Sequence, residues 1–82
     1  MKNNFRIRIC SDLDYEELVA DICYDNYKIA TIMQDKGKDN MEIEIFFSVD
    51  ENESWKFPLN DFMEAISIAK KQLIEVENNN IN

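Results

Sequence analysis

Carboxylates are the side chains of this sequence most able to do chemistry, because Asp and Glu account for 17 of its 82 residues. Two neighbouring carboxylates can act together as a general acid and a general base. With so many of them, close pairs arise by chance and identify no catalytic site. The sequence contains no histidine, which is the most frequent general base and the most frequent metal ligand in proteins. The composition therefore favours a non-enzymatic protein.

Two cysteines and one acidic turn are the other candidates for chemistry. Cys10 and Cys23 have no histidine to activate them and form no CxxC pair, so we expect reduced, partly buried thiols. Residues 35–40 (DKGKDN) lack the ligand spacing of a calcium-binding loop and contain the only glycine, so they predict a tight turn. We predict no catalytic residues, no metal ligands and no cofactor.

The charge is unevenly distributed along the chain. Residues 11–53 contain 13 acidic and three basic residues, whereas the rest of the chain is slightly basic and the whole carries a net charge of -8. This balance disfavours nucleic acids and anionic membranes as ligands and favours a basic protein partner. The alternative is that the acidic charge only keeps a small protein soluble. Composition leaves both interpretations open.

Aromatic residues supply a second candidate for protein binding, because Tyr and Trp often anchor interfaces. Tyr15 lies in an acidic turn, and Trp55 follows the polar segment 48–54, so we expect both to be exposed, although Trp55 fits a core position equally well. The predicted partner-binding residues are Asp14, Tyr15, Asp21, Asp25, Glu42 and Glu44.

Alternating apolar and polar residues predict the strands that must position these side chains. Residues 4–10, 27–33 and 41–47 alternate clearly, and a short fifth strand is expected at 55–57. Residues 17–25 fit a strand or a helix. The Asp25–Asn26 pair that follows tolerates positive φ angles, so we predict a β-hairpin about it.

The alternation also assigns faces to the predicted sheet. We expect the inward residues to be Phe5, Ile7, Ile9, Tyr27, Ile29, Thr31, Met33, Met41, Ile43, Ile45 and Phe47. The opposite face would carry Arg6, Arg8, Asp21, Cys23, Lys28, Ala30, Ile32, Glu42, Glu44 and Phe46. Its Ala30, Ile32 and Phe46 would form an apolar centre within an acidic rim, as interaction surfaces often do, or would only pad a solvated face.

A C-terminal helix follows Pro58. Phe62, Ile66, Ala69, Leu73 and Val76 recur at spacings of four and three residues and form one apolar stripe, with Asn60 as the expected N-cap. The sequence therefore predicts an α+β fold, an antiparallel β-meander of four to five strands with one C-terminal helix packed on one face. We expect one domain over residues 1–76 and a frayed tail at 77–82.

Two segments carry a resemblance to a known class of proteins. Residues 11–45, with a Ser-Asp-x-Asp-Tyr opening, two apolar strands and an acidic hairpin, and residues 57–73, with a Pro-Leu-x-Asp-Phe helix start, resemble small bacterial immunity proteins of polymorphic-toxin and contact-dependent inhibition systems. The resemblance implies binding and blocking of a cognate toxin domain, often a nuclease with a basic active site. It supplies no binding residues to carry over.

The remaining expectations concern location and partners. Residues 1–10 do not resemble a signal peptide, and no apolar run approaches the ~20 residues of a membrane span, so we expect a cytoplasmic protein. The alternative to an immunity protein is a regulatory adaptor or DNA-mimicking inhibitor of a housekeeping protein. Because an exposed sheet edge can pair with another copy, we expect a monomer or a homodimer.

Overall fold

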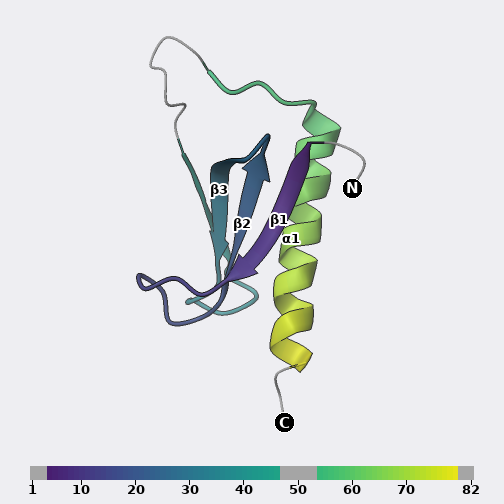
Figure 1. Ribbon diagram of the computed structural model, residues 1–82. Helices are drawn as coiled ribbons and strands as arrows, with labels where there is room; N and C mark the ends of the chain where they lie inside the picture. The colour runs from purple at the N-terminus through teal and green to yellow at the C-terminus, as the bar shows by residue number, and fades with distance from the viewer. Residues whose placement is uncertain (1–3, 47–53, 80–82) are drawn as a thin grey trace.

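The computed structural model describes residues 4–46 and 54–79, with side chains up to residue 76. Its described residues form an antiparallel meander with the strand order β1-β2-β3-β4 and one helix packed against it, so the predicted α+β fold is confirmed (Figure 1). The elements are β1 (Phe5–Cys10), β2 (Val19–Tyr24), β3 (Tyr27–Met33), β4 (Glu42–Ile45) and α1 (Leu59–Asn79).

The ends of the helix differ from the prediction. Residues 54–58 have no regular secondary structure, so the expected fifth strand at 55–57 is wrong. The carbonyl oxygen of Pro58 accepts the first helical hydrogen bond, from the Phe62 N–H at 3.1 Å, which places the N-cap at Pro58 and not at Asn60. The helix continues to Asn79, beyond the expected boundary at residue 76.

The β2–β3 hairpin forms as predicted because its two turn residues accept left-handed backbone angles. Asp25 has φ 50° and Asn26 has φ 74°, and Tyr24 lies opposite Tyr27. Asp and Asn tolerate this region better than other side chains do. The ambiguous segment before the turn is therefore a strand.

A β-bulge in this hairpin changes the faces of β3. Cys23 lies opposite Lys28 and Ile22 lies opposite Ala30, so Ile29 is an extra residue on the β3 side. Ile29 and Ala30 both enter the core. Beyond the bulge the alternation is inverted, so Ile32 faces the helix while Thr31 and Met33 face away from it, which corrects the predicted assignment. The apolar centre expected from Ala30 and Ile32 on the other face therefore does not exist.

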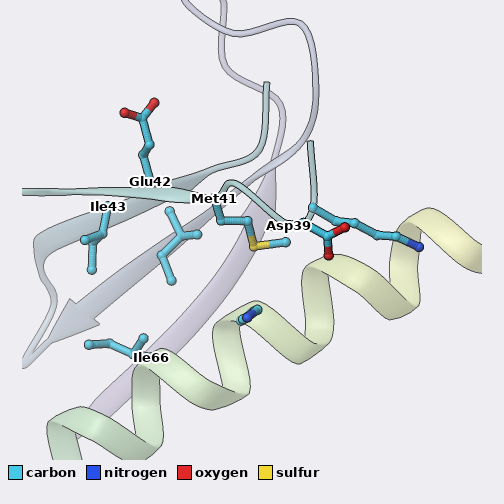
Figure 2. Close-up of a pocket in the computed structure, with 8 residues that line it drawn as sticks. Asp39, Met41, Glu42, Ile43 and Ile66 are labelled. Carbon is cyan, nitrogen blue, oxygen red and sulfur yellow. The ribbon is translucent and has the colours of Figure 1, made fainter. Parts of the chain in front are cut away.

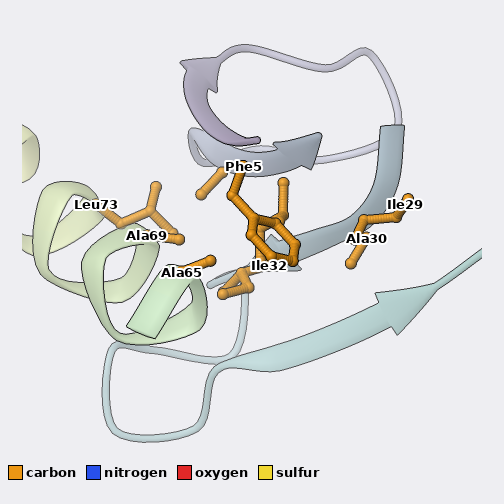
Figure 3. Packing of buried hydrophobic residues seen from close by; sticks show 9 residues of the cluster. Phe5, Ile29, Ala30, Ile32, Ala65, Ala69 and Leu73 are labelled. Carbon is orange, nitrogen blue, oxygen red and sulfur yellow. The ribbon is translucent and has the colours of Figure 1, made fainter. Parts of the chain in front are cut away.

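The core lies between the sheet and the helix (Figure 3). Ala65, Ala69 and Leu73 bring one side of α1 close to the sheet, where Phe5 and Ile32 are buried. The predicted inward residues of β1 take part, and aromatic rings extend the core at the start of the helix. Phe57 contacts Phe5, Tyr24, Trp55 and Phe62, with ring centroids 4.7–5.7 Å apart.

The helix covers only one half of its face of the sheet. It packs on β1 and β2, at one side of the sheet (Figure 1). Ile43 and Ile45 lie opposite the core residues Ile32 and Ala30, on the side predicted to face inward, but they are 40% and 58% exposed. Phe47, the other expected inward residue there, lies outside the described residues. We call the side of the sheet that α1 packs on the helix face, and the other side the outer face.

Candidate protein-interaction site

The predicted binding residue Asp21 lies at the centre of the outer face but is only 3% exposed. Strand pairing places it in a row between Arg8 of β1 and Thr31 of β3. Its carboxylate accepts hydrogen bonds from an Arg8 guanidinium nitrogen at 3.0 Å, from the Thr31 hydroxyl at 2.9 Å and from the Cys10 thiol at 3.4 Å. Neighbouring side chains therefore cover Asp21, and its role in partner binding stays a prediction.

The surroundings of Asp21 explain its charge state. Burial favours the neutral acid, but the hydrogen bonds from Arg8, Thr31 and Cys10 favour the carboxylate more strongly, so the pKa of Asp21 is lowered. The pKa of the Cys10 thiol shifts in the opposite direction. Burial, followed by the hydrogen bond to Asp21, raises the pKa of Cys10. Both cysteines are free, and Cys10 lies opposite Val19 while Cys23 lies opposite Arg6, too far apart in the ladder for a disulfide.

Asp25 is exposed but lies apart from the other predicted residues. It sits in the hairpin turn after β2, at the end of the sheet where its N–H donates to the Asn4 carbonyl oxygen at 3.3 Å. Residues 11–18 enter β2 at the opposite end. The six residues of β2 separate these ends by roughly 17–20 Å. Asp25 and Asp14 therefore do not share one compact site.

Asp14, Tyr15 and Glu44 are brought together. Burial raises the pKa of Tyr15, and the carboxylates of Glu44, Asp12, Asp14 and Asp35 raise it further. These acids come from the 11–18 loop, from β4 and from the turn after β3, so only the fold makes them neighbours. We call this group the Tyr15 surface: Asp12, Asp14, Tyr15, Asp35 and Glu44.

Hydrogen bonds between side chains and the backbone hold the loop of the Tyr15 surface in place. The Asp35 carboxylate accepts hydrogen bonds from the N–H groups of Glu16 at 3.3 Å and Glu17 at 3.0 Å. The Gln34 side-chain amide donates to the Leu18 carbonyl oxygen at 2.9 Å. Because both anchors follow β3 directly, the loop is fastened to the central hairpin.

A tight turn completes this loop. The Asp12 carboxylate accepts from the Asp14 N–H at 2.9 Å, and the Asp12 carbonyl oxygen accepts from the Tyr15 N–H at 3.1 Å. This side-chain turn is typical of Asp and orients the next residues without a helix. Sequence reasoning missed Asp12 and Asp35 as part of the site. The signal that could have identified Asp12 is its residue type, because an Asp side chain often accepts a hydrogen bond from the N–H two residues later.

Glu42, the last predicted residue, is exposed and forms an ion pair with Lys36 at 3.3 Å. An exposed pair of this kind contributes at most about 1 kcal/mol to stability. Glu42 is therefore partly neutralised, whereas Asp14 and Glu44 form none of the ion pairs seen among the described residues. At neutral pH the Tyr15 surface presents carboxylate acceptors around a neutral phenol, a chemistry suited to Lys and Arg side chains.

A separate groove of about 220 Å³ lies between β4 and α1 (Figure 2). Ile32, Met41 and Ile43 line it from the sheet, and Ile66 lines it from the helix. The other residues that line it are Lys38, Asp39, Glu42 and Lys70. We call it the β4–α1 groove. Over residues 4–46 and 54–79, no cluster of His, Cys, Asp and Glu has the arrangement of a metal site.

Comparison with known proteins gave no match: no protein-family model, no curated protein and no solved structure is significantly similar to the chain. In the described part of the chain, α1 is not apolar enough to cross a membrane.

Proposed function

We propose that the protein is a non-enzymatic inhibitor that binds a basic protein domain, and specifically an immunity protein that neutralises a cognate toxin. The observation that carries the proposal is the gathering of carboxylates around Tyr15 from three separate segments of the chain. A tyrosine near several charges of one sign, in a loop that Asp35 fastens to the sheet, resembles the aromatic anchors and charged rims of protein interfaces.

Electrostatics supports a cationic partner over a nucleic acid or an anionic lipid. The net charge of -8 and the uncompensated Asp14 and Glu44 attract positively charged proteins and accelerate their association. A toxin domain that binds nucleic acid has a basic groove. The Tyr15 surface would compete with phosphates for that groove.

The absence of histidine from the whole sequence supports a binding role over general base catalysis. Cys10, which is hydrogen-bonded to Asp21, supports the same conclusion. Burial and Asp21 raise the pKa of Cys10, which disfavours the thiolate that a nucleophile needs.

The test is an affinity capture of the tagged protein from its native cells, with partners identified by mass spectrometry at low and high salt. We expect one basic protein whose recovery falls at high salt, because exposed charges are screened. The variant Asp14→Lys with Glu44→Lys should lose that protein. The control Glu64→Lys with Glu75→Lys makes the same change in net charge on the exposed side of α1 and should retain it.

A growth assay then separates immunity from the adaptor hypothesis. The captured protein is expressed alone and together with this chain. Toxicity alone and rescue by the native chain, but not by the Asp14 and Glu44 variant, would support immunity. A non-toxic housekeeping protein would favour the regulatory adaptor. Equal capture by both double variants would contradict the role of the Tyr15 surface.

A further inference from the structure

The outer backbone of β4 is unpaired within the described sheet. Among residues 4–46 and 54–79, β3 is the one strand that pairs with β4. The Phe46 N–H donates to the Ile29 carbonyl oxygen at 2.8 Å, toward β3. Backbone groups of alternate residues in an antiparallel strand point to opposite sides. The N–H and C=O groups of Ile43 and Ile45 therefore point away from β3, where another strand could bond to them.

The two faces of β4 differ sharply in chemistry. On the helix face, Ile43 and Ile45 are exposed beside the β4–α1 groove. On the outer face, Glu42 and Glu44 lie opposite Met33 and Thr31 and are exposed. A strand that paired with β4 would thus place alternate side chains against isoleucines and against carboxylates.

The helix extends the apolar side of this edge. Leu59, Met63 and Ile66 recur at spacings of four and three residues, so they form one stripe along α1. Ile66 lines the β4–α1 groove (Figure 2). Leu59 and Met63 are among the exposed large apolar residues. Apolar side chains of an added strand would continue this apolar surface on the outer side of Ile43 and Ile45.

We propose that the β4 edge binds an extended segment of the partner protein in which apolar residues alternate with Lys or Arg. The proposal rests on the proposed function, since it names the part of the basic partner that this chain recognises. Main-chain hydrogen bonds to Ile43 and Ile45 would supply affinity, and the two faces of β4 would supply specificity.

Charge argues against a second copy of the chain at this edge. Antiparallel pairing of β4 with itself would bring Glu42 and Glu44 of one copy beside the same carboxylates of the other. Like charges on directly opposed strand residues are destabilising, and each copy carries a net charge of -8. A basic alternating segment removes this conflict.

The test measures binding of a fluorescein-labelled peptide of alternating Lys and Ile (KIKIKIK) to the whole protein. Its matched controls are EIEIEIE and two N-methylated forms, one methylated on the Ile residues and one on the Lys residues. When the peptide pairs with β4, either the N–H groups of its Ile residues or those of its Lys residues face β4, and the other set faces solvent. We expect at least a tenfold loss of affinity for EIEIEIE and for one methylated form, and little change for the other.

Two protein variants separate the edge from general attraction. Ile45→Lys places a charge on the apolar side of β4 at a position that is already exposed, so the core is preserved. Ser11→Lys makes the same change in charge after β1, the opposite edge of the sheet. We expect at least a tenfold loss of KIKIKIK binding for Ile45→Lys and less than a twofold change for Ser11→Lys.

Amide chemical shifts in the ¹⁵N-labelled protein locate the peptide. Shifts at Ile43, Ile45 and Met63 would support the proposal. It would be overturned by shifts confined to the Tyr15 surface, by equal affinity of both methylated forms, by absence of binding, or by β4 shifts that depend on protein concentration without peptide. None of these results decides the proposed function, because the capture experiment scores recovery of a native basic protein, whereas the peptide assay scores pairing with the backbone of Ile43 and Ile45.

Discussion

Replacing Asp21 should destabilise the protein because the side chain is buried and accepts hydrogen bonds from three sides. Asp21→Ala removes the bonds from the Thr31 hydroxyl and the Cys10 thiol, together with the ion pair to Arg8. It also leaves the Thr31 hydroxyl, on a residue that is 3% exposed, without this acceptor. A buried donor that loses its partner costs about 1–3 kcal/mol.

The contribution of Arg8 is smaller than its charge suggests. Its side chain is 66% exposed, so water replaces Asp21 when the carboxylate is removed. We therefore expect Asp21→Ala to lower the free energy of unfolding by about 2–4 kcal/mol, mostly through Thr31 and Cys10. This is a large part of the stability of a small domain, about 4–12 kcal/mol at this length.

The pH dependence of the free energy of unfolding supplies a second, independent readout. Because the folded-state pKa of Asp21 is lowered, the unfolded state binds more protons in the range between the two pKa values. The stabilisation from ionised Asp21 is fully present above its unfolded pKa of about 3.9 and is lost as pH falls through the folded pKa. The stability difference between the native chain and Asp21→Asn should therefore be larger at neutral pH than in strong acid.

Urea unfolding followed by the fluorescence of the single tryptophan measures both effects. Trp55 is half-buried and stacks on Phe57 with ring centroids 5.7 Å apart, so unfolding changes its surroundings. Thr31→Val and the double variant complete a mutant cycle with Asp21→Ala, in which we expect coupling of about 1 kcal/mol. A loss below about 0.5 kcal/mol for Asp21→Ala, or a difference independent of pH, would refute the reasoning.

Other regions give shorter predictions. Leu73→Ala should cost about 2–5 kcal/mol of unfolding free energy in urea, whereas Leu13→Ala, at a fully exposed position, should change it by less than about 0.5 kcal/mol; equal effects would contradict the described core. Asn26→Gly should preserve stability and Asn26→Val should reduce the melting temperature, because φ at Asn26 is positive; a stable valine variant would argue against this turn. Gly37→Ala should lower the free energy of unfolding by about 1 kcal/mol, measured in urea, because φ there is 99°. An added Cβ meets no atom within 4 Å, so backbone strain is the one expected cause, and a stabilised variant would contradict it. Cys10 should react with iodoacetamide more slowly than the same residue in an unfolded peptide at pH 8.5, as followed by mass spectrometry, because its pKa is raised.

The elements were predictable because their signals are local. Alternating apolar and polar residues predict β1, and the apolar stripe from Phe62 to Leu73 predicts the helix. The hairpin was predictable because Asp25 and Asn26 tolerate positive φ angles. The bulge at Ile29 was not predictable, because it depends on how β2 and β3 pair. One extra residue there inverts every later face assignment in β3.

The candidate site was predictable only in part, for the same reason. Asp14 and Glu44 are 30 positions apart along the chain. Only the pairing of β4 with β3 and the anchoring of the loop by Asp35 bring them near Tyr15. Asp21 had the polarity expected of a binding residue. Its burial follows from the row that it shares with Arg8 and Thr31, which no local pattern reveals.

The open apolar face of β4 follows from the number of elements. Neighbouring strands lie about 4.8 Å apart and a helix with its side chains is about 10 Å wide, so one helix covers about two strands. Four strands and one helix therefore leave roughly half of the helix face uncovered within the described residues. Ala65 and Ala69 place α1 over β1 and β2, and the uncovered half falls on Ile43 and Ile45. A sequence with four alternating strands and one apolar helix already implies such a face, and alternation at β4 shows which side chains occupy it. The edge is thus a consequence of the architecture, and a partner strand is the element that would complete it.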